Sequence, residues 1–123
     1  MCLYVKGKNG QETFRSKENV LAQKRVAKRD IVVYKWLEQG NMSPFRGFHF
    51  TVNRLYKIKS LRISTYKSCE YHVGDVSRGF HAYTKRIKNR ITCKGLIPKG
   101  SEYVLGVGNQ IVSNQFILLE NFD

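Results

Sequence analysis

The chain has 123 residues and carries 22 Lys+Arg against 9 Asp+Glu, which gives a formal net charge of +13 at pH 7. This length predicts one domain over residues 1–123, and the 41% of apolar and 12% of aromatic residues exclude a disordered basic tail. No apolar run approaches the ~18 residues of a membrane span, and the first residues do not follow the pattern of a signal peptide. We therefore expect a folded cytoplasmic protein with no membrane partner.

The cysteines predict free thiols. Cys2, Cys69 and Cys93 are odd in number and far apart in the sequence, and no pair has the spacing of metal ligands. Free thiols of this kind are typical of reducing compartments. No cluster of Asp, Glu and His has metal-ligand spacing either, so we expect no metal site and no cofactor.

The first quarter of the chain predicts a turn, a short helix and a strand. Glycines over residues 6–10 predict the turn, and residues 16–29 have weak helical spacing that also fits a loop with one helical turn. Residues 31–37 are β-branched or aromatic on both alternating faces, apart from Lys35. Such a strand is expected in the centre of a sheet.

Residues 48–59 predict a half-exposed antiparallel strand because their apolar side chains alternate. Arg54 interrupts one face, which otherwise carries Phe48, Phe50, Val52, Tyr56 and Ile58. The pattern allows the strand to continue over residues 61–66 after a bend at Ser60.

The second half of the chain predicts four strands, over residues 79–83, 91–97, 102–107 and 111–120. Residues 106–109 (Gly-Val-Gly-Asn) predict a hairpin turn between the last two, and they lack the Lys-Ser/Thr of a phosphate-binding loop. Thr84 is a candidate cap for a short basic turn over residues 85–90. Six or seven short, mostly antiparallel strands with one or two short helices indicate a β-rich α+β domain.

The positive charge lies in two acid-free windows. No acid occurs between Glu38 and Glu70, or between Asp75 and Glu102. If the strands in these windows are neighbours, their cations form one surface that binds phosphates with release of counterions. The predicted contacts are Arg46, Arg54, Lys57, Lys59, Arg62, Arg78, Lys85, Arg86, Lys88 and Arg90.

Tyrosines within the same windows are candidates for stacking on bases, namely Tyr56, Tyr66, Tyr71 and Tyr83. The alternative interpretation is that the cations are a solvated face and the tyrosines are edges of the core. Charge alone does not distinguish DNA, RNA, a nucleotide or an acidic protein surface as the partner.

One histidine motif is similar to half of a catalytic signature. The sequence His49-Phe50-Thr51 resembles one of the two His-x-Thr/Ser motifs of the 2H phosphoesterases, which place one imidazole as base and one as acid. Neither His72 nor His81 supplies the second motif. No catalytic residue is therefore predicted, and we expect a binding protein rather than an enzyme.

The third histidine has a second functional interpretation. Residues 77–83 (Ser-Arg-Gly-Phe-His-Ala-Tyr) are similar to the Gly-x-His strand of some ADP-ribosyltransferase-like folds, where the imidazole holds a ribose hydroxyl. Glu102 and Glu120, the glutamates that follow His81, lie in no recognisable catalytic motif. The alternative function is therefore a nucleotide-binding protein, either an enzyme or a nucleotide sponge, with a pocket formed by Arg78, His81 and Tyr83.

Four stretches together resemble a family of small uncharacterised proteins from gut bacteria, their phages and mobile elements. They are residues 27–35, 79–83, 97–103 and 112–117. The resemblance implies a phage or mobile-element accessory protein that acts by binding in the host cell, as an inhibitor of a host defence complex or as a minor virion component. The expected partner is nucleic acid, a nucleic-acid-containing complex, or an acidic or nucleic-acid-binding host protein.

Overall fold

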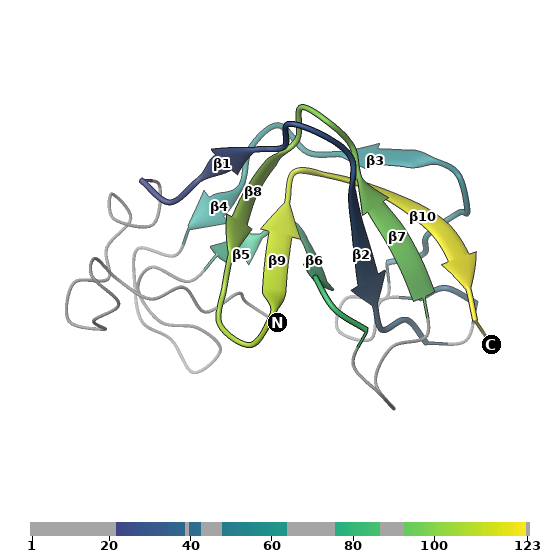
Figure 1. Ribbon diagram of the computed structural model, residues 1–123. Helices are drawn as coiled ribbons and strands as arrows, with labels where there is room; N and C mark the ends of the chain where they lie inside the picture. Colours follow the sequence, from purple (N-terminus) through teal and green to yellow (C-terminus); the bar gives the residue numbers. More distant parts are fainter. Residues whose placement is uncertain (1–21, 39, 43–47, 64–75, 87–92, 123) are drawn as a thin grey trace.

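The computed structural model describes residues 22–38, 40–42, 48–63, 76–86 and 93–122, and these residues are all-β (Figure 1). Within these ranges there is no helix, and hence no helix long and apolar enough to cross a membrane. The strands are β1 (Arg25–Val26), β2 (Ile31–Lys35), β3 (Leu55–Lys57), β4 (Arg62–Ile63), β5 (Val76–Arg78), β6 (Phe80–Tyr83), β7 (Cys93–Ile97), β8 (Glu102–Leu105), β9 (Gln110–Ser113) and β10 (Gln115–Asn121).

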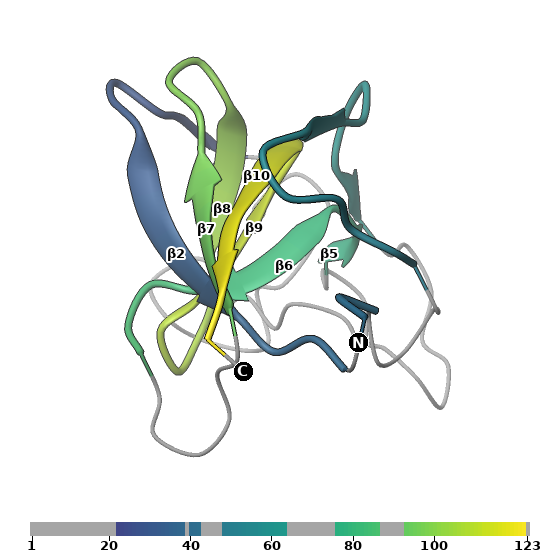
Figure 2. The same cartoon turned by 90° about the vertical axis from the view of Figure 1, so that its right-hand side faces the viewer.

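Eight strands form one antiparallel sheet in the order β1-β8-β9-β6-β2-β7-β10-β3. The sheet curls so that several strands converge near the C-terminal end of the chain and spread apart at the other end (Figure 2). The remaining strands, β4 and β5, form a separate antiparallel pair. Antiparallel sheets can bury one face and leave the other in water, and this sheet does so over much of its area.

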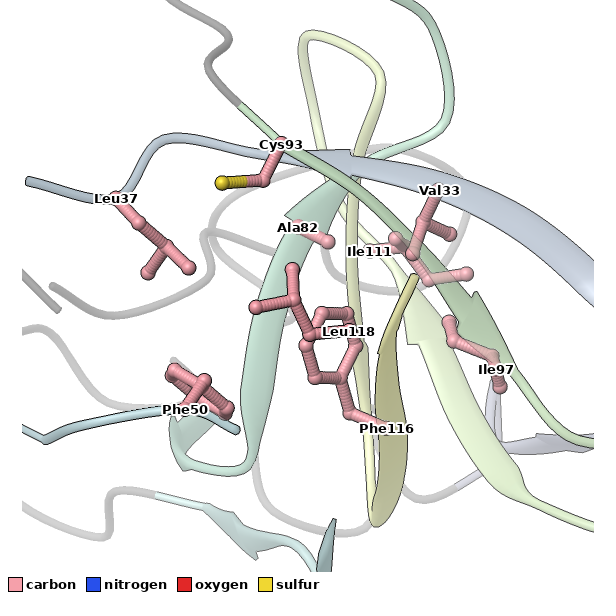
Figure 3. Close-up of a cluster of buried hydrophobic side chains, with 9 residues drawn as sticks. All are labelled: Val33, Leu37, Phe50, Ala82, Cys93, Ile97, Ile111, Phe116 and Leu118. Carbon is pink, nitrogen blue, oxygen red and sulfur yellow. The ribbon is translucent and has the colours of Figure 1, made fainter. Parts of the chain in front are cut away.

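The core lies on the inner face of the curled sheet (Figure 3). Its centre is the β2–β7–β10 ladder, where Val33 lies opposite Gly95 and Gly95 lies opposite Leu118. The buried cluster consists of Val33, Leu37, Phe50, Ala82, Cys93, Ile97, Ile111, Phe116 and Leu118. Burial of this apolar surface is the main stabilisation of the fold.

Gly95 shows why a glycine occupies the middle of a core strand. A Cβ atom at this position would overlap the ring of Phe116 and would lie 3.0 Å from the carbonyl oxygen of Ile117. The aromatic ring therefore packs directly on the backbone of β7, an approach that only glycine allows.

The outer face of the sheet, opposite the core, is also covered where β8 and β9 lie. Val104 and Val112 are buried but lie outside the core cluster. A Cβ at Gly79 would lie 2.5 Å from Val112 Cγ2 and 2.7 Å from Leu61 Cδ2, so these side chains meet over Gly79. The chain entering β4 thus covers the outer side of β9.

The predicted helices are not present in the described residues. The described part of residues 16–29 is a turn followed by β1, which pairs with β8. The backbone N–H of Ala27 also donates to the carbonyl oxygen of Ser101, and the Ala27 carbonyl accepts from the N–H of Gly100. These long-range backbone pairs outweigh the weak helical spacing, so the α+β prediction is wrong for this segment. At the second predicted helical turn, Lys85 lies in a bend and residues 87–90 fall outside the described ranges.

The strand predictions were correct where the apolar pattern was strong. β2 lies centrally between β6 and β7, as predicted, and residues 106–109 form the turn between β8 and β9. Two predicted strands are shorter than expected. Residues 48–59 contribute only β3, because Asn53 adopts a left-handed conformation with φ of 65°. Residues 111–120 divide at Asn114 into β9 and β10.

Candidate anion-binding surface

Five exposed cations follow the edge strand β3, the connection after it and the β4–β5 pair. We call this set the basic rim, and it consists of Arg54, Lys57, Lys59, Arg62 and Arg78. The backbone N–H of Ile58 donates to Asn114 O at 2.9 Å, which extends the pairing of β3 with β10 and fixes the start of the connection. Segments 48–63 and 76–86 contain no acidic residue.

The β4–β5 pair joins the two acid-free windows. Arg62 of the first window lies directly opposite Arg78 of the second in an antiparallel register. Like charges directly opposite each other on two strands are destabilising. Both arginine side chains are exposed, so the ladder brings two positive charges of the rim close together.

The predicted contacts Lys85 and Arg86 lie far from the basic rim. Lys57 is opposite Gln115 at the start of β10, whereas the Arg86 guanidinium lies 4.4 Å from the ring centroid of Phe122, just past the end of β10. A strand rises about 3.3 Å per residue, so these positions are about 23 Å apart along β10. Lys85 and Arg86 therefore form a second basic region, and Arg46, Lys88 and Arg90 lie outside the described residues.

Tyr56 is an edge of the core, as the alternative interpretation expects. It faces inward and contacts Phe50, with ring centroids 5.1 Å apart. Its hydroxyl accepts a hydrogen bond from the backbone N–H of Thr51 at 2.6 Å. Burial would raise the pKa of Tyr56, but the hydrogen bonds from Thr51 and the charge of Arg54 outweigh it and lower the pKa.

Phe48 supplies the open aromatic surface beside the rim. Its ring is 46% exposed and contacts Tyr56 edge-on at 5.6 Å, while the Arg54 guanidinium lies 5.6 Å from the Tyr56 ring centroid on a cation–π contact. The sequence prediction placed Phe48 on the apolar face and missed this role. The only sign in the sequence that the Phe48 ring is exposed was its position at the start of the alternating pattern over residues 48–59. Of the other candidate stacking residues, Tyr83 is half-buried opposite Tyr34, and Tyr66 and Tyr71 lie outside the described residues.

The alternative nucleotide site is split between two ladders. Arg78 lies in β5 and pairs with β4, whereas His81 and Tyr83 lie in β6 and pair with β9. The His81 ring nitrogen Nδ1 is 3.1 Å from the carbonyl oxygen of Gly79. His49 is exposed and bridges to Met42. Within the described ranges, no group of three His, Cys, Asp or Glu could hold a metal ion.

Lys35 is a part-buried cation that the sequence prediction did not identify as special. Lys35 faces the core opposite Cys93, and its Nζ donates a hydrogen bond to the backbone carbonyl of His81 at 2.5 Å. The ammonium lies 5.6 Å from the Phe50 ring centroid and 5.9 Å from that of Phe116. Burial lowers the pKa of Lys35 to about 8, and the charge interaction with Cys93 opposes this shift.

No protein-family model matches the chain, and no curated protein or solved structure is significantly similar to it. The resemblance to proteins of phages and mobile elements therefore stays an expectation from the sequence.

Proposed function

We propose that this protein binds single-stranded nucleic acid along the basic rim. The observation that carries the proposal is the position of Phe48, an exposed ring that packs on Tyr56 of the edge strand β3, where Tyr56 also contacts the Arg54 guanidinium of the rim. Proteins that bind single strands combine a positive track for the backbone with aromatic rings on which bases stack.

Each part of the rim has a distinct role in this mechanism. Lys57 and Lys59 contact successive phosphates along the edge of β3, and each contact releases counterions from the strand. The Arg62–Arg78 pair holds a further phosphate between two guanidinium groups, which suit bidentate contacts to phosphate oxygens. One base stacks on Phe48, and the cation–π contact of Arg54 with Tyr56 keeps this guanidinium near the same base.

The cellular setting that we propose comes from the family resemblance. A phage or mobile-element accessory protein with this surface would act on nucleic acid or on a nucleic-acid-containing host defence complex. Affinity purification from the native cell, with and without nuclease, separates the two kinds of direct partner. Partners that disappear after nuclease treatment support nucleic acid, and partners that remain indicate an acidic host protein instead.

The direct test is a charge reversal within the rim, Arg54→Glu/Lys57→Glu/Lys59→Glu. Binding to a fluorescently labelled single-stranded oligonucleotide is measured by anisotropy. Loss of two phosphate contacts and of the Arg54 contact near the base, with addition of three negative charges, is expected to weaken binding by about 100-fold or more.

The matched control is Lys28→Glu/Arg29→Glu/Lys99→Glu, which makes the same change in net charge at exposed positions. These residues lie in the β1–β2 and β7–β8 turns, on the other side of the sheet from the β3–β4 connection (Figure 2). The control should weaken binding by less than about 5-fold, because distant charges are screened. If the rim variant folds normally and binds as well as the control, the proposed surface is wrong.

A further inference from the structure

A row of side chains crosses the outer face of the sheet, on the side opposite the core. Gln110 of β9 lies opposite Tyr83 of β6. Tyr83 lies opposite Tyr34 of β2, and Tyr34 lies opposite Lys94 of β7. The row thus places two tyrosines side by side on central strands, between an amide and an ammonium group. We call Tyr34 and Tyr83 the tyrosine pair.

The tyrosine pair points away from the core. The residue that precedes each tyrosine belongs to the buried cluster, and successive side chains of a strand lie on opposite faces. Both tyrosines are half-buried on the outer face, so part of each ring is open to solvent. Side chains directly opposite each other on neighbouring strands have Cβ atoms about 5 Å apart, so the two rings are neighbours on this face.

Trp36 adds a third ring near the tyrosine pair. It lies two residues after Tyr34, and Leu37, the residue after it, is in the core. Trp36 is therefore on the outer face as well, where it is 45% exposed. Aromatic rings that lie outside a core and next to cations are the platform on which the bases of a single strand stack.

Strand β6 leads from the basic rim to the tyrosine pair. Arg78 of the rim ends β5, and Tyr83 ends β6 five residues later, at most about 17 Å away. Lys85 and Arg86 follow and are exposed, and segment 76–86 contains no acidic residue. A phosphate backbone that leaves the rim along β6 therefore meets no carboxylate of this segment, and two cations lie at the end of its path.

These features fit a single strand rather than a duplex or an apolar protein surface. The bases of a duplex are stacked inside the helix, whereas the unpaired bases of a single strand can lie on aromatic rings. On the β10 side, Glu120 lies opposite Lys94 and limits the anion-binding surface, so the backbone reaches the pair from β6. The acid-free approach along β6 and the cations at its end favour an anionic occupant over an apolar one.

We propose that a single strand bound at the basic rim continues along β6 and stacks two further bases on Tyr83 and Tyr34. This inference rests on the function proposed above and adds a second subsite to it. A single β-domain covers about 4–16 nucleotides of a single strand. We expect an oligonucleotide of about 4 nucleotides to fill the rim alone, and one of about 16 nucleotides to reach the tyrosine pair as well.

The first test uses the fluorescence of Trp36, the single tryptophan of the chain. The wild-type protein is saturated with oligothymidylate of either length, and saturation is followed by anisotropy. A base stacked beside Trp36 should quench its fluorescence when the longer oligonucleotide binds, and the shorter one should leave it unchanged. Equal quenching by both lengths, or none by the longer one, would overturn the second subsite.

The second test removes the two rings with Tyr34→Leu/Tyr83→Leu. The matched control is Tyr34→Phe/Tyr83→Phe, which keeps both rings. The leucine variant should bind the longer oligonucleotide at least about 10-fold more weakly than the wild type and the shorter one equally well, because only stacking contacts are lost. The phenylalanine variant should bind both lengths like the wild type.

The two oligonucleotides separate failure of this inference from failure of the proposed function. A leucine variant that binds the longer oligonucleotide as tightly as the wild type contradicts the subsite. An equal loss of binding for both lengths also contradicts it, since the tyrosines would then only support the fold. A wild-type protein that binds neither length contradicts the proposed function, and this inference with it.

Discussion

At the scale of single residues, Lys35 is the most unusual group in the fold. Its ammonium lies against two aromatic rings of the core and donates a hydrogen bond to the carbonyl of His81. The sequence identified Lys35 only as the polar exception in an apolar strand. Its inward direction depends on the register with Cys93, which pairs residues 58 positions apart and cannot be deduced from a local pattern.

We predict that Lys35→Met stabilises the protein at pH 7. A pKa lowered from 10.5 to about 8 corresponds to a penalty of roughly 3 kcal/mol for the charged form of Lys35 in the folded state. Methionine removes this penalty but also removes the hydrogen bond to His81, which costs about 1 kcal/mol of stability. The net expected gain in the free energy of unfolding is about 2 kcal/mol, measured by denaturant titration.

The pH dependence of this gain follows from the direction of the shift. Below pH 8, Lys35 is protonated in the folded and the unfolded chain, and the full penalty applies. Between about pH 8 and 10.5 the unfolded chain binds more protons, so the wild type becomes more stable as pH rises. The advantage of Lys35→Met should therefore shrink across this interval. An advantage that is independent of pH would show that the lysine is not buried in its charged form.

At the scale of elements, local patterns predicted the strands whose apolar residues are contiguous and failed where distant backbone groups decide the boundary. Asn114 divides the predicted 111–120 strand because its N–H donates to Glu102 O and its side-chain oxygen accepts from Glu102 N–H. β1 forms because it pairs with β8, with support from the 2.8 Å ion pair between Lys24 and Glu102. Neither contact leaves a signal in the local sequence.

The β4–β5 ladder gives a prediction at this scale. Substitution Arg78→Thr removes the like-charge neighbour of Arg62 and places a β-branched residue in the strand. We expect the free energy of unfolding to rise by about 0.2–1 kcal/mol, and binding of single-stranded oligonucleotide to weaken by about 3- to 10-fold. Thermal melting and anisotropy measure the two effects. Loss of both stability and binding would indicate that Arg78 is structural.

At the scale of the whole molecule, the sequence predicted that the positive charge belongs to a folded surface, but not its geometry. The two windows do meet at Arg62 and Arg78, yet β6 carries the chain from β5 to the other end of the sheet (Figure 2). Lys85 and Arg86 are consequently separated from the rim, although the sequence places them only a few residues after Arg78. The direction of β6 determines this separation, and a charge pattern alone does not predict it.

The central claim is that cations of the rim bind the phosphates of a single strand. The most direct measurement is the salt dependence of binding to a single-stranded oligonucleotide between about 50 and 200 mM salt. Three phosphates, contacted by Lys57, Lys59 and the Arg62–Arg78 pair, predict a slope of about −2 for log K against log salt concentration, which is a loss of about 20-fold over this range. The rim charge-reversal variant should retain little of this slope, while the Lys28/Arg29/Lys99 control should retain most of it. A wild-type slope near zero, or a slope unchanged in the rim variant, would contradict the account.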